Sequence, residues 1–196
     1  MKKHILICTF LIVALTNSCA TVNDQLRERN DDSVIYSTFI NYYIDNFLDK
    51  KIENFVVSIN TERPDILYES DPETISIFLK HLPIIDTDLF NSFKAKNSNS
   101  VKIQRNIKSQ YPIEYLGKEQ IKEFFTERNW DKFKSTYQRS QGLMSFSQVG
   151  YSGDGMKALL YYGNSCGMKC GGGGFVVFQK VKASWEVLVV FPIWIS

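Results

Sequence analysis

The sequence predicts one α+β domain, with N-terminal helices packed on a C-terminal antiparallel β-meander. Two patterns in the 196-residue chain support this class. Between residues 33 and 137, apolar residues recur at spacings of three and four, as they do on one face of a helix. From residue 146 onward, β-branched and alternating runs are separated by short turn segments, which is typical of a meander. No repeat or internal linker follows residue 33, so we expect a single domain over residues 33–196.

The first helix is expected after Ser33, which suits the N-cap position. Lysines at positions 50 and 51 would end it, because positive charge interacts favourably with the C-terminal end of a helix. Its expected buried face consists of Tyr36, Phe39, Ile40, Tyr43, Ile44, Phe47 and Leu48. A short β-branched run over residues 54–60 then predicts a strand.

Two more helices are expected between residues 71 and 96. The sequence Asp-Pro-Glu at 71–73 predicts a helix start, and Pro83 would end that helix. Its buried stripe would be Ile75, Phe78, Leu79 and Leu82. A shorter helix is expected from Asp86 or Thr87, with the Asp86-x-Asp88 pair as its cap. The inward residues of this shorter helix would be Leu89, Phe90 and Phe93.

The middle of the chain is expected to contain short strands and further helical turns. Residues 101–107 alternate between apolar and polar types, which suggests a half-exposed strand, and residues 111–116 suggest another. Gly117 precedes a helix whose inner face would carry Ile121, Phe124 and Phe125. The aromatic residues that continue at helical spacing, and that we expect in the core rather than in a ligand cage, are Trp130, Phe133 and Tyr137.

The C-terminal third predicts the meander itself. The four expected strands cover residues 146–151, 157–162, 174–181 and 185–195. The glycine-rich segment 163–174 would form a long loop between the second strand and the third. We expect all three tryptophans, Trp130, Trp185 and Trp194, to be largely buried.

Residues 1–18 have the pattern of an export signal. Lys2 and Lys3 provide the positive start, and an uncharged run of eleven residues follows from Ile5 to Leu15. That run is too short to span a bilayer, for which about 20 apolar residues are needed. Residues 19–32 are polar and almost free of large apolar groups, so we expect them to form a flexible tether.

Two processing routes are compatible with residues 16–20. Ser18 before Cys19 resembles the lipobox of bacterial lipoproteins, in which the cysteine is acylated and becomes the new N-terminus. The match is incomplete, because Thr16 stands where the motif usually has leucine. The alternative is ordinary signal cleavage after Ala20, which the small residues Ser18 and Ala20 permit. We therefore expect a lipid anchor at Cys19, and a soluble periplasmic or secreted protein is the alternative.

The charge balance excludes several classes of function. Lysine plus arginine number 23 against 21 acidic residues, and loss of Lys2 and Lys3 with the signal gives 21 against 21. Such neutrality argues against a nucleic-acid partner, which requires a basic surface. Only His81 remains once His4 leaves with the signal, so multi-histidine metal motifs are excluded and we expect no cofactor or metal.

The segment 163–174 is the most unusual part of the chain, since it holds six of the eleven glycines. It also contains Cys166 and Cys170, the two cysteines left after processing, and an even count in an exported chain predicts a disulfide. The spacing of three residues differs from that of redox enzymes, in which two residues separate the cysteines at a helix N-terminus. A glycine-rich loop could bind an anion through its backbone, with Lys169 as the nearby cation. The candidate contact residues are Gly163, Asn164, Lys169 and Gly172.

Other potentially reactive groups fit structural roles better. Glu119, Glu123 and Glu127 stand four residues apart on one expected helix, beside lysines at 118 and 122. This spacing is typical of a solvated face rather than of a catalytic carboxylate pair. His81 falls at the end of an expected helix, and no motif supplies a nucleophile for it.

Several aromatic and glycine positions resemble those of a family of uncharacterised bacterial envelope proteins. The resemblance covers roughly residues 33–196 and is best after residue 130. It consists of Trp130-x2-Phe133-x3-Tyr137, Ser147-Gln148-Val149-Gly150-Tyr151, Ala158-Leu159-x-Tyr161, Gly174-x4-Gln179-Lys180, Trp185 and Trp194-Ile195-Ser196. The resemblance implies an envelope location and the fold, but it implies no activity.

Two hypotheses about function follow. The first is a non-catalytic lipoprotein of the bacterial envelope that contacts the membrane through Cys19 and binds an envelope protein or a small ligand. The second is an envelope enzyme, which would exchange disulfides at Cys166 and Cys170 or use carboxylates as a hydrolase. The absence of a catalytic motif favours the first hypothesis.

Overall fold

The computed structural model describes residues 31–48, 52–65, 73, 79–125 and 130–196. The chain divides into two units, Met1–Asp32 and Ser33–Ser196, of which the second contains nearly all of the described residues. The expected export signal, Cys19 and the tether up to residue 30 lie outside the described residues. So does most of the helix expected after residues 71–73.

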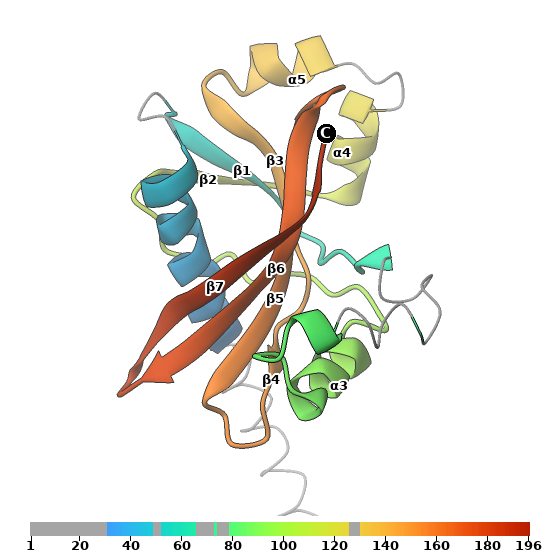
Figure 1. Ribbon diagram of the computed structural model, residues 1–196. Coiled ribbons are helices and arrows are strands. Elements are labelled where there is room, and N and C mark those ends of the chain that lie inside the picture. Colours follow the sequence, from blue (N-terminus) through green and yellow to red (C-terminus); the bar gives the residue numbers. More distant parts are fainter. Residues whose placement is uncertain (1–30, 49–51, 66–72, 74–78, 126–129) are drawn as a thin grey trace, which may run out of the picture. The chain divides into compact units, whose positions relative to one another are not determined.

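A seven-stranded sheet forms the centre of the second unit (Figure 1). Its strands are β1 (Asn54–Ser58), β2 (Ile113–Leu116), β3 (Ser140–Phe146), β4 (Gly150–Tyr151), β5 (Lys157–Gly167), β6 (Cys170–Val181) and β7 (Ser184–Ile195). The strand order is β2-β1-β3-β5-β6-β7, and the short β4 also pairs with β5. β1 runs parallel to both β2 and β3, whereas the pairs β3–β5, β5–β6 and β6–β7 are antiparallel.

The sheet is therefore not a purely C-terminal meander, since β1 and β2 join it from the N-terminal half of the chain. The expected α+β class is confirmed in the general sense that the domain combines a sheet with helices. β1 and β2 fall within runs expected to be strands, but their parallel pairing escaped prediction because the partners lie far apart in sequence: Phe55 pairs with Ile113, and Val56 with Leu143. Parallel neighbours need long crossover connections, which local alternation does not reveal.

Helical segments contact both faces of the sheet. They are residues 31–47, α3 (Thr87–Lys96), α4 (Lys118–Phe125) and α5 (Trp130–Thr136). Side chains of residues 35–44 share one apolar cluster with alternate residues of β1, β3, β5 and β6. In that cluster the rings of Phe39 and Tyr162 lie 4.6 Å apart. We call the side of the sheet that these residues occupy the first face.

The second face of the sheet carries two separate apolar clusters. In one, Leu89 and Phe93 of α3 pack against Leu159, Phe175 and Val177. The other cluster joins α4 and α5 to β1, β2 and β3 and consists of Val56, Leu116, Phe124 and Phe133 with flanking aromatic side chains. Successive residues of β5 and β6 point alternately to the two faces of the sheet, and both faces are covered. These strands are therefore apolar at every position over residues 158–162 and 175–178.

Most expected elements are present, with displaced boundaries. The cap expected for α3 is confirmed, because Asp86 accepts a hydrogen bond from the Leu89 backbone N–H at 2.9 Å. The first helix already includes residues 31 and 32, so Ser33 is not its N-cap. The Ser33 hydroxyl instead donates to Asn106 Oδ1 at 2.5 Å. Phe47, expected inside, is 53% exposed and packs beside the rings of Tyr42 and Tyr43 on its own helix.

The strand expected over residues 101–107 does not form. Among the described residues this segment makes one isolated bridge, between Asn60 and Lys102. Just after this segment the chain contacts the first helix, since the Lys108 N–H donates to Ser37 Oγ at 2.8 Å. Alternation here reflects a short pairing with residues 59–61, where the Ile103 N–H donates to the Ile59 carbonyl at 2.7 Å and the Ile103 side chain is buried, rather than a strand in a ladder.

The prediction of a long loop over residues 163–174 is wrong. β5 continues to Gly167 and β6 begins at Cys170, so the connection is a two-residue turn formed by Met168 and Lys169. Sequence reasoning treated the glycines as loop residues because they offer no side-chain alternation. The tryptophan prediction holds for Trp185, which is 6% exposed, whereas Trp130 and Trp194 are half-buried.

Candidate functional site

The end of the β5–β6 hairpin is closed by the predicted disulfide between Cys166 and Cys170, which is confirmed. The two Cα atoms are 5.0 Å apart. Cys170 pairs with Gly167 in the ladder, so the disulfide joins Cys170 to the residue just before its strand partner. Met168 in that turn is 72% exposed, and Lys169 beside it is also exposed. The disulfide thus lies between two strand ends and not at a helix N-terminus, the setting that lowers thiol pKa values in redox enzymes.

The glycines of this hairpin make room for Trp194. A Cβ atom added at Gly173 would lie 2.5 Å from Trp194 Nε1 and 2.6 Å from the carbonyl oxygen of Tyr162. One added at Gly163 would lie 3.1 Å from Ser145 Oγ and 3.6 Å from the Trp194 ring. The indole N–H donates to Tyr161 Oη at 2.8 Å, which fixes the ring over the glycines. The glycine-rich composition therefore has a packing reason that the sequence alone did not reveal.

The four candidate contact residues occupy different environments. Gly163 is buried beneath Trp194, and Gly172 is half-buried. Asn164 is only 5% exposed, and its Nδ2 donates to the Gln141 carbonyl at 3.1 Å. Asn164 also lies against Tyr43: burial raises the pKa of the Tyr43 hydroxyl, and a hydrogen bond with Asn164 opposes that rise. Of the four residues, Lys169 is the one that lies fully at the surface.

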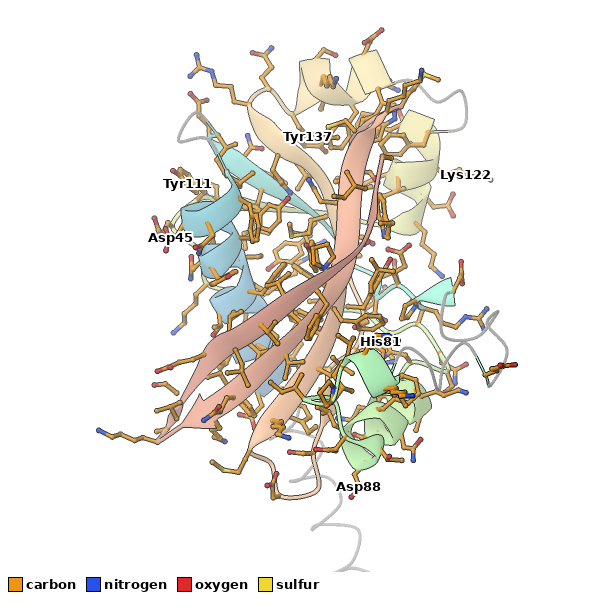
Figure 2. The ribbon with its side chains drawn as sticks, viewed as in Figure 1. Asp45, His81, Asp88, Tyr111, Lys122 and Tyr137 are labelled. Atoms are coloured by element: carbon orange, nitrogen blue, oxygen red, sulfur yellow. A yellow bond between two sulfur atoms is a disulfide. The ribbon has the colours of Figure 1, made fainter. Side chains whose placement is uncertain are left out.

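A pocket of about 270 Å³ opens beside Cys166. Its lining comes from α5, from the turn that follows α5, and from β3 and β5. The side chains that line it are those of Phe133, Lys134, Tyr137, Arg139, Ser140 and Cys166. Sequence reasoning missed the polar members of this set, because no motif distinguishes them from ordinary surface residues. Figure 2 labels Tyr137 beneath α5.

Backbone hydrogen bonds hold the turn that carries these side chains. The Tyr137 N–H donates to the Phe133 carbonyl at 2.8 Å, and the Ser140 N–H donates to the Tyr137 carbonyl at 3.2 Å. Arg139 adopts a left-handed conformation, with φ of 56°, so that the chain reverses directly into β3. The Glu53 N–H then donates to the Arg139 carbonyl at 2.9 Å, which ties the turn to the beginning of β1.

Gly142 brings the wall of the pocket close to the disulfide. Its φ of +112° is a conformation that other residues rarely adopt. A Cβ atom at this position would lie 2.9 Å from the Cys166 Cα, so only glycine lets β3 approach β5 this closely. The disulfide therefore lines a pocket whose other members come from α5 and its turn.

The pocket contains positive charge at its rim. Lys134 is exposed and makes no ion pair with any residue in the described part of the chain, and its Nζ lies 3.7 Å from the position a Cβ would take on Gly167. Arg139 pairs with Glu53 at the surface. Burial raises the pKa of Tyr137, and the carboxylates of Glu114 and Glu123 raise it further, so its hydroxyl remains a hydrogen-bond donor.

The other candidate groups lie apart from this pocket. His81 is exposed and is labelled near α3 in Figure 2. Glu119 and Glu123 are exposed, and Glu123 forms an ion pair of 2.7 Å with Lys132, in agreement with a solvated face. Glu127 lies outside the described residues. The Asp86 carboxylate is engaged by the Leu89 backbone N–H and by Lys157 at 3.1 Å, and both contacts lower its pKa.

Comparisons with known proteins add no relative: no family model, no curated protein and no solved structure matches the chain. Within the described ranges, no group of three histidine, cysteine or acidic side chains is placed to hold a metal ion. None of the helices in this same part of the chain is long and apolar enough to cross a membrane.

Proposed function

We propose that this chain is an exported, lipid-anchored protein of the bacterial envelope, whose domain over residues 33–196 binds a ligand or partner without catalysing a reaction. The export pattern of residues 1–18 and the lipobox-like Cys19 support the location. In this proposal the N-terminal helices pack on the sheet as its support, and binding occurs at the disulfide-closed end of the β5–β6 hairpin. Acylation at Cys19 would attach the protein to a membrane.

The observation that carries the proposal is the pocket beside Cys166. It combines a structured rim, cationic side chains and hydroxyl donors, which are groups that recognise ligands. Nucleophilic catalysis would need a nucleophile within hydrogen-bond reach of a base. The lining residues include no histidine, aspartate or glutamate, the side chains that most often act as a general base. The lining of this pocket therefore favours a binding site over a hydrolytic active site.

The position of the disulfide also favours a structural role over thiol–disulfide exchange. An exchange enzyme needs a stabilised thiolate, usually supplied by a helix N-terminus. Cys166 and Cys170 occupy strand ends instead. We expect the bond to resist mild thiol reductants that reduce exchange enzymes quantitatively. Complete reduction by such a reductant, giving one thiol of low pKa, would support the enzyme hypothesis instead.

Site-specific photo-crosslinking in living cells tests the proposed binding surface. A photoreactive residue at position 169 reports on the hairpin turn, and the same residue at position 108 is the matched control. Lys108 is also exposed, but its segment lies along the first helix. The proposal predicts a specific adduct from position 169 and none from position 108. Adducts of equal yield from both positions, or none from position 169, would contradict it.

The lipid anchor has its own test. Mass spectrometry of the mature N-terminus should show an acylated Cys19, and Cys19→Ser should release the chain from membranes or block its processing. A mature wild-type chain that begins at Thr21 and fractionates as a soluble protein would show that cleavage after Ala20 is the correct alternative.

A further inference from the structure

The pocket beside Cys166 has the features of a site for a small anion that also carries an apolar part. Lys134 supplies a positive charge with no ion-pair partner among the described residues. Ser140 and Tyr137 add hydroxyls for which the structure shows no side-chain hydrogen bond to another described residue. An ammonium group and neutral donors that converge on one pocket suit a carboxylate, which accepts several hydrogen bonds.

Arg139 can also bind a ligand in the pocket while it keeps its ion pair with Glu53. Its ion pair with Glu53 lies at the surface, where the two side chains are 66% and 59% exposed, so the pair contributes little to stability. A guanidinium has five N–H donors in a planar arrangement, of which one carboxylate uses at most two. The remaining donors stay available to a ligand in the pocket.

The apolar part of the ligand has a matching wall. The ring of Tyr137 is half-buried and rests on Phe133, with 5.2 Å between the ring centroids. Cys166 also lines the pocket, and Gly142 lets β3 lie close to it. A volume of about 270 Å³ is at the lower limit of small-molecule sites, which typically span about 300–1,000 Å³. The pocket is thus too small for a polymer segment with bulky substituents but large enough for one ring with a short acidic arm.

We propose that this pocket binds a small amphipathic monocarboxylate, with the carboxylate between Lys134 and Arg139 and the apolar body between Tyr137 and the disulfide. This inference rests on the proposed binding function and names the chemical class of the ligand. Nearby carboxylates explain why a single charge fits better than two. Glu53 is present at the rim, and Glu114 and Glu123 act on Tyr137, so the local field repels a dianion more strongly than a monoanion.

Titration of the purified full chain with phenylacetate tests the proposal, followed by the backbone amide resonances of residues 134, 139, 140 and 142. Phenylacetamide has the same shape without the charge, and inorganic phosphate has the charge without the ring. We expect saturable shifts with phenylacetate and at least about tenfold weaker binding of both comparison compounds, equivalent to about 1.4 kcal/mol. Binding of either comparison compound as tightly as phenylacetate would overturn the proposal, as would the absence of saturable shifts at these amides.

Two substitutions at Lys134 distinguish the effect of its charge on ligand affinity from an effect on folding. Lys134→Glu should weaken phenylacetate at least about tenfold, and Lys134→Arg should restore most of the affinity. Lys108→Glu, an equal charge change along the first helix, should leave affinity unchanged. Because Lys134 is exposed, the variant should melt like the wild type, and Arg139→Gln provides a second test if it does not. Unchanged affinity in both Lys134→Glu and Arg139→Gln would overturn the proposal. Crosslinking from position 169 is independent of these outcomes, so the proposed function and the ligand class can fail separately.

Discussion

The two halves of the β5–β6 hairpin are built by different means. We call residues 157–162 with 174–181 the packed half, and residues 163–167 with 170–173 the glycine half. In the packed half, Leu159, Leu160, Phe175 and Val176 are all fully buried, and they alternate between the two faces of the sheet. In the glycine half, Trp194 covers glycines, and a disulfide closes the end.

This contrast separates the part of the sheet that stabilises the domain from the part that can present a site. Burial of large apolar side chains on both faces stabilises the packed half. A strand end rich in glycine buries little apolar surface of its own and loses more conformational entropy on ordering. We therefore expect changes in the packed half to unfold the domain, and changes in the glycine half to act locally. Stability and binding would then depend on different residues.

The largest effect is expected in the packed half. Phe175 is fully buried on the second face, where its ring lies 5.7 Å from that of Phe93. Phe175→Ala should lower the free energy of unfolding by about 3–5 kcal/mol, because it removes apolar contacts and leaves a cavity between the sheet and α3. Denaturant unfolding measures this loss. A loss below about 1 kcal/mol would mean that α3 is not firmly packed on the sheet.

An added methyl group in the glycine half should have the next largest effect. Gly173→Ala places a Cβ against both the Trp194 indole and the Tyr162 carbonyl, and the carbonyl belongs to a neighbouring strand that cannot move aside easily. We expect a loss of about 1–3 kcal/mol. The matched control is Gly153→Ala, since nothing lies within 4 Å of the added Cβ there. Equal stabilities of the two variants would show that Trp194 does not lie on Gly173.

Removal of the disulfide should cost less. Cys166→Ser together with Cys170→Ser opens a very small ring, so the entropic loss should fall at or below the low end of about 2–4 kcal/mol. The same double variant should weaken crosslinking from position 169, because the turn would lose its preformed shape. A melting transition as strongly lowered as that of Phe175→Ala would contradict a local role for the bond.

The smallest effect concerns the cap of α3, the helix that covers the packed half. Asp86→Ala should cost about 1 kcal/mol at pH 7, whereas Asp88→Ala, which removes an acid from the first turn, should cost less. The pKa of Asp86 is lowered in the folded state, first by the Leu89 backbone N–H and then by Lys157. Its contribution is therefore present above the unfolded pKa of about 3.9 and is lost as the pH falls through the folded value. Equal losses for Asp86→Ala at pH 7 and at pH 2 would contradict this assignment.

The same contrast explains which features the sequence predicts. The packed half, the α3 cap and the disulfide follow local rules: alternation, an aspartate before a helix, and an even number of cysteines. The glycine half escaped prediction because its partner, Trp194, lies on β7 and its glycines mimic a loop. The polar residues of the pocket, Lys134 and Arg139, carry no sequence signal, since the pocket forms only where α5 and its turn lie beside Cys166, which is remote in sequence.

Hydrogen exchange of the hairpin amides tests the distinction between the two halves most directly. The comparison is between the wild type and the Cys166→Ser, Cys170→Ser double variant. The account predicts that amides of residues 163–167 and 170–173 exchange at least about tenfold faster in the variant, because local opening becomes easier by about 1.4 kcal/mol. Amides of residues 158–161 and 175–178 should keep their wild-type rates. Acceleration by the same factor in both halves, or no acceleration in either, would contradict the account.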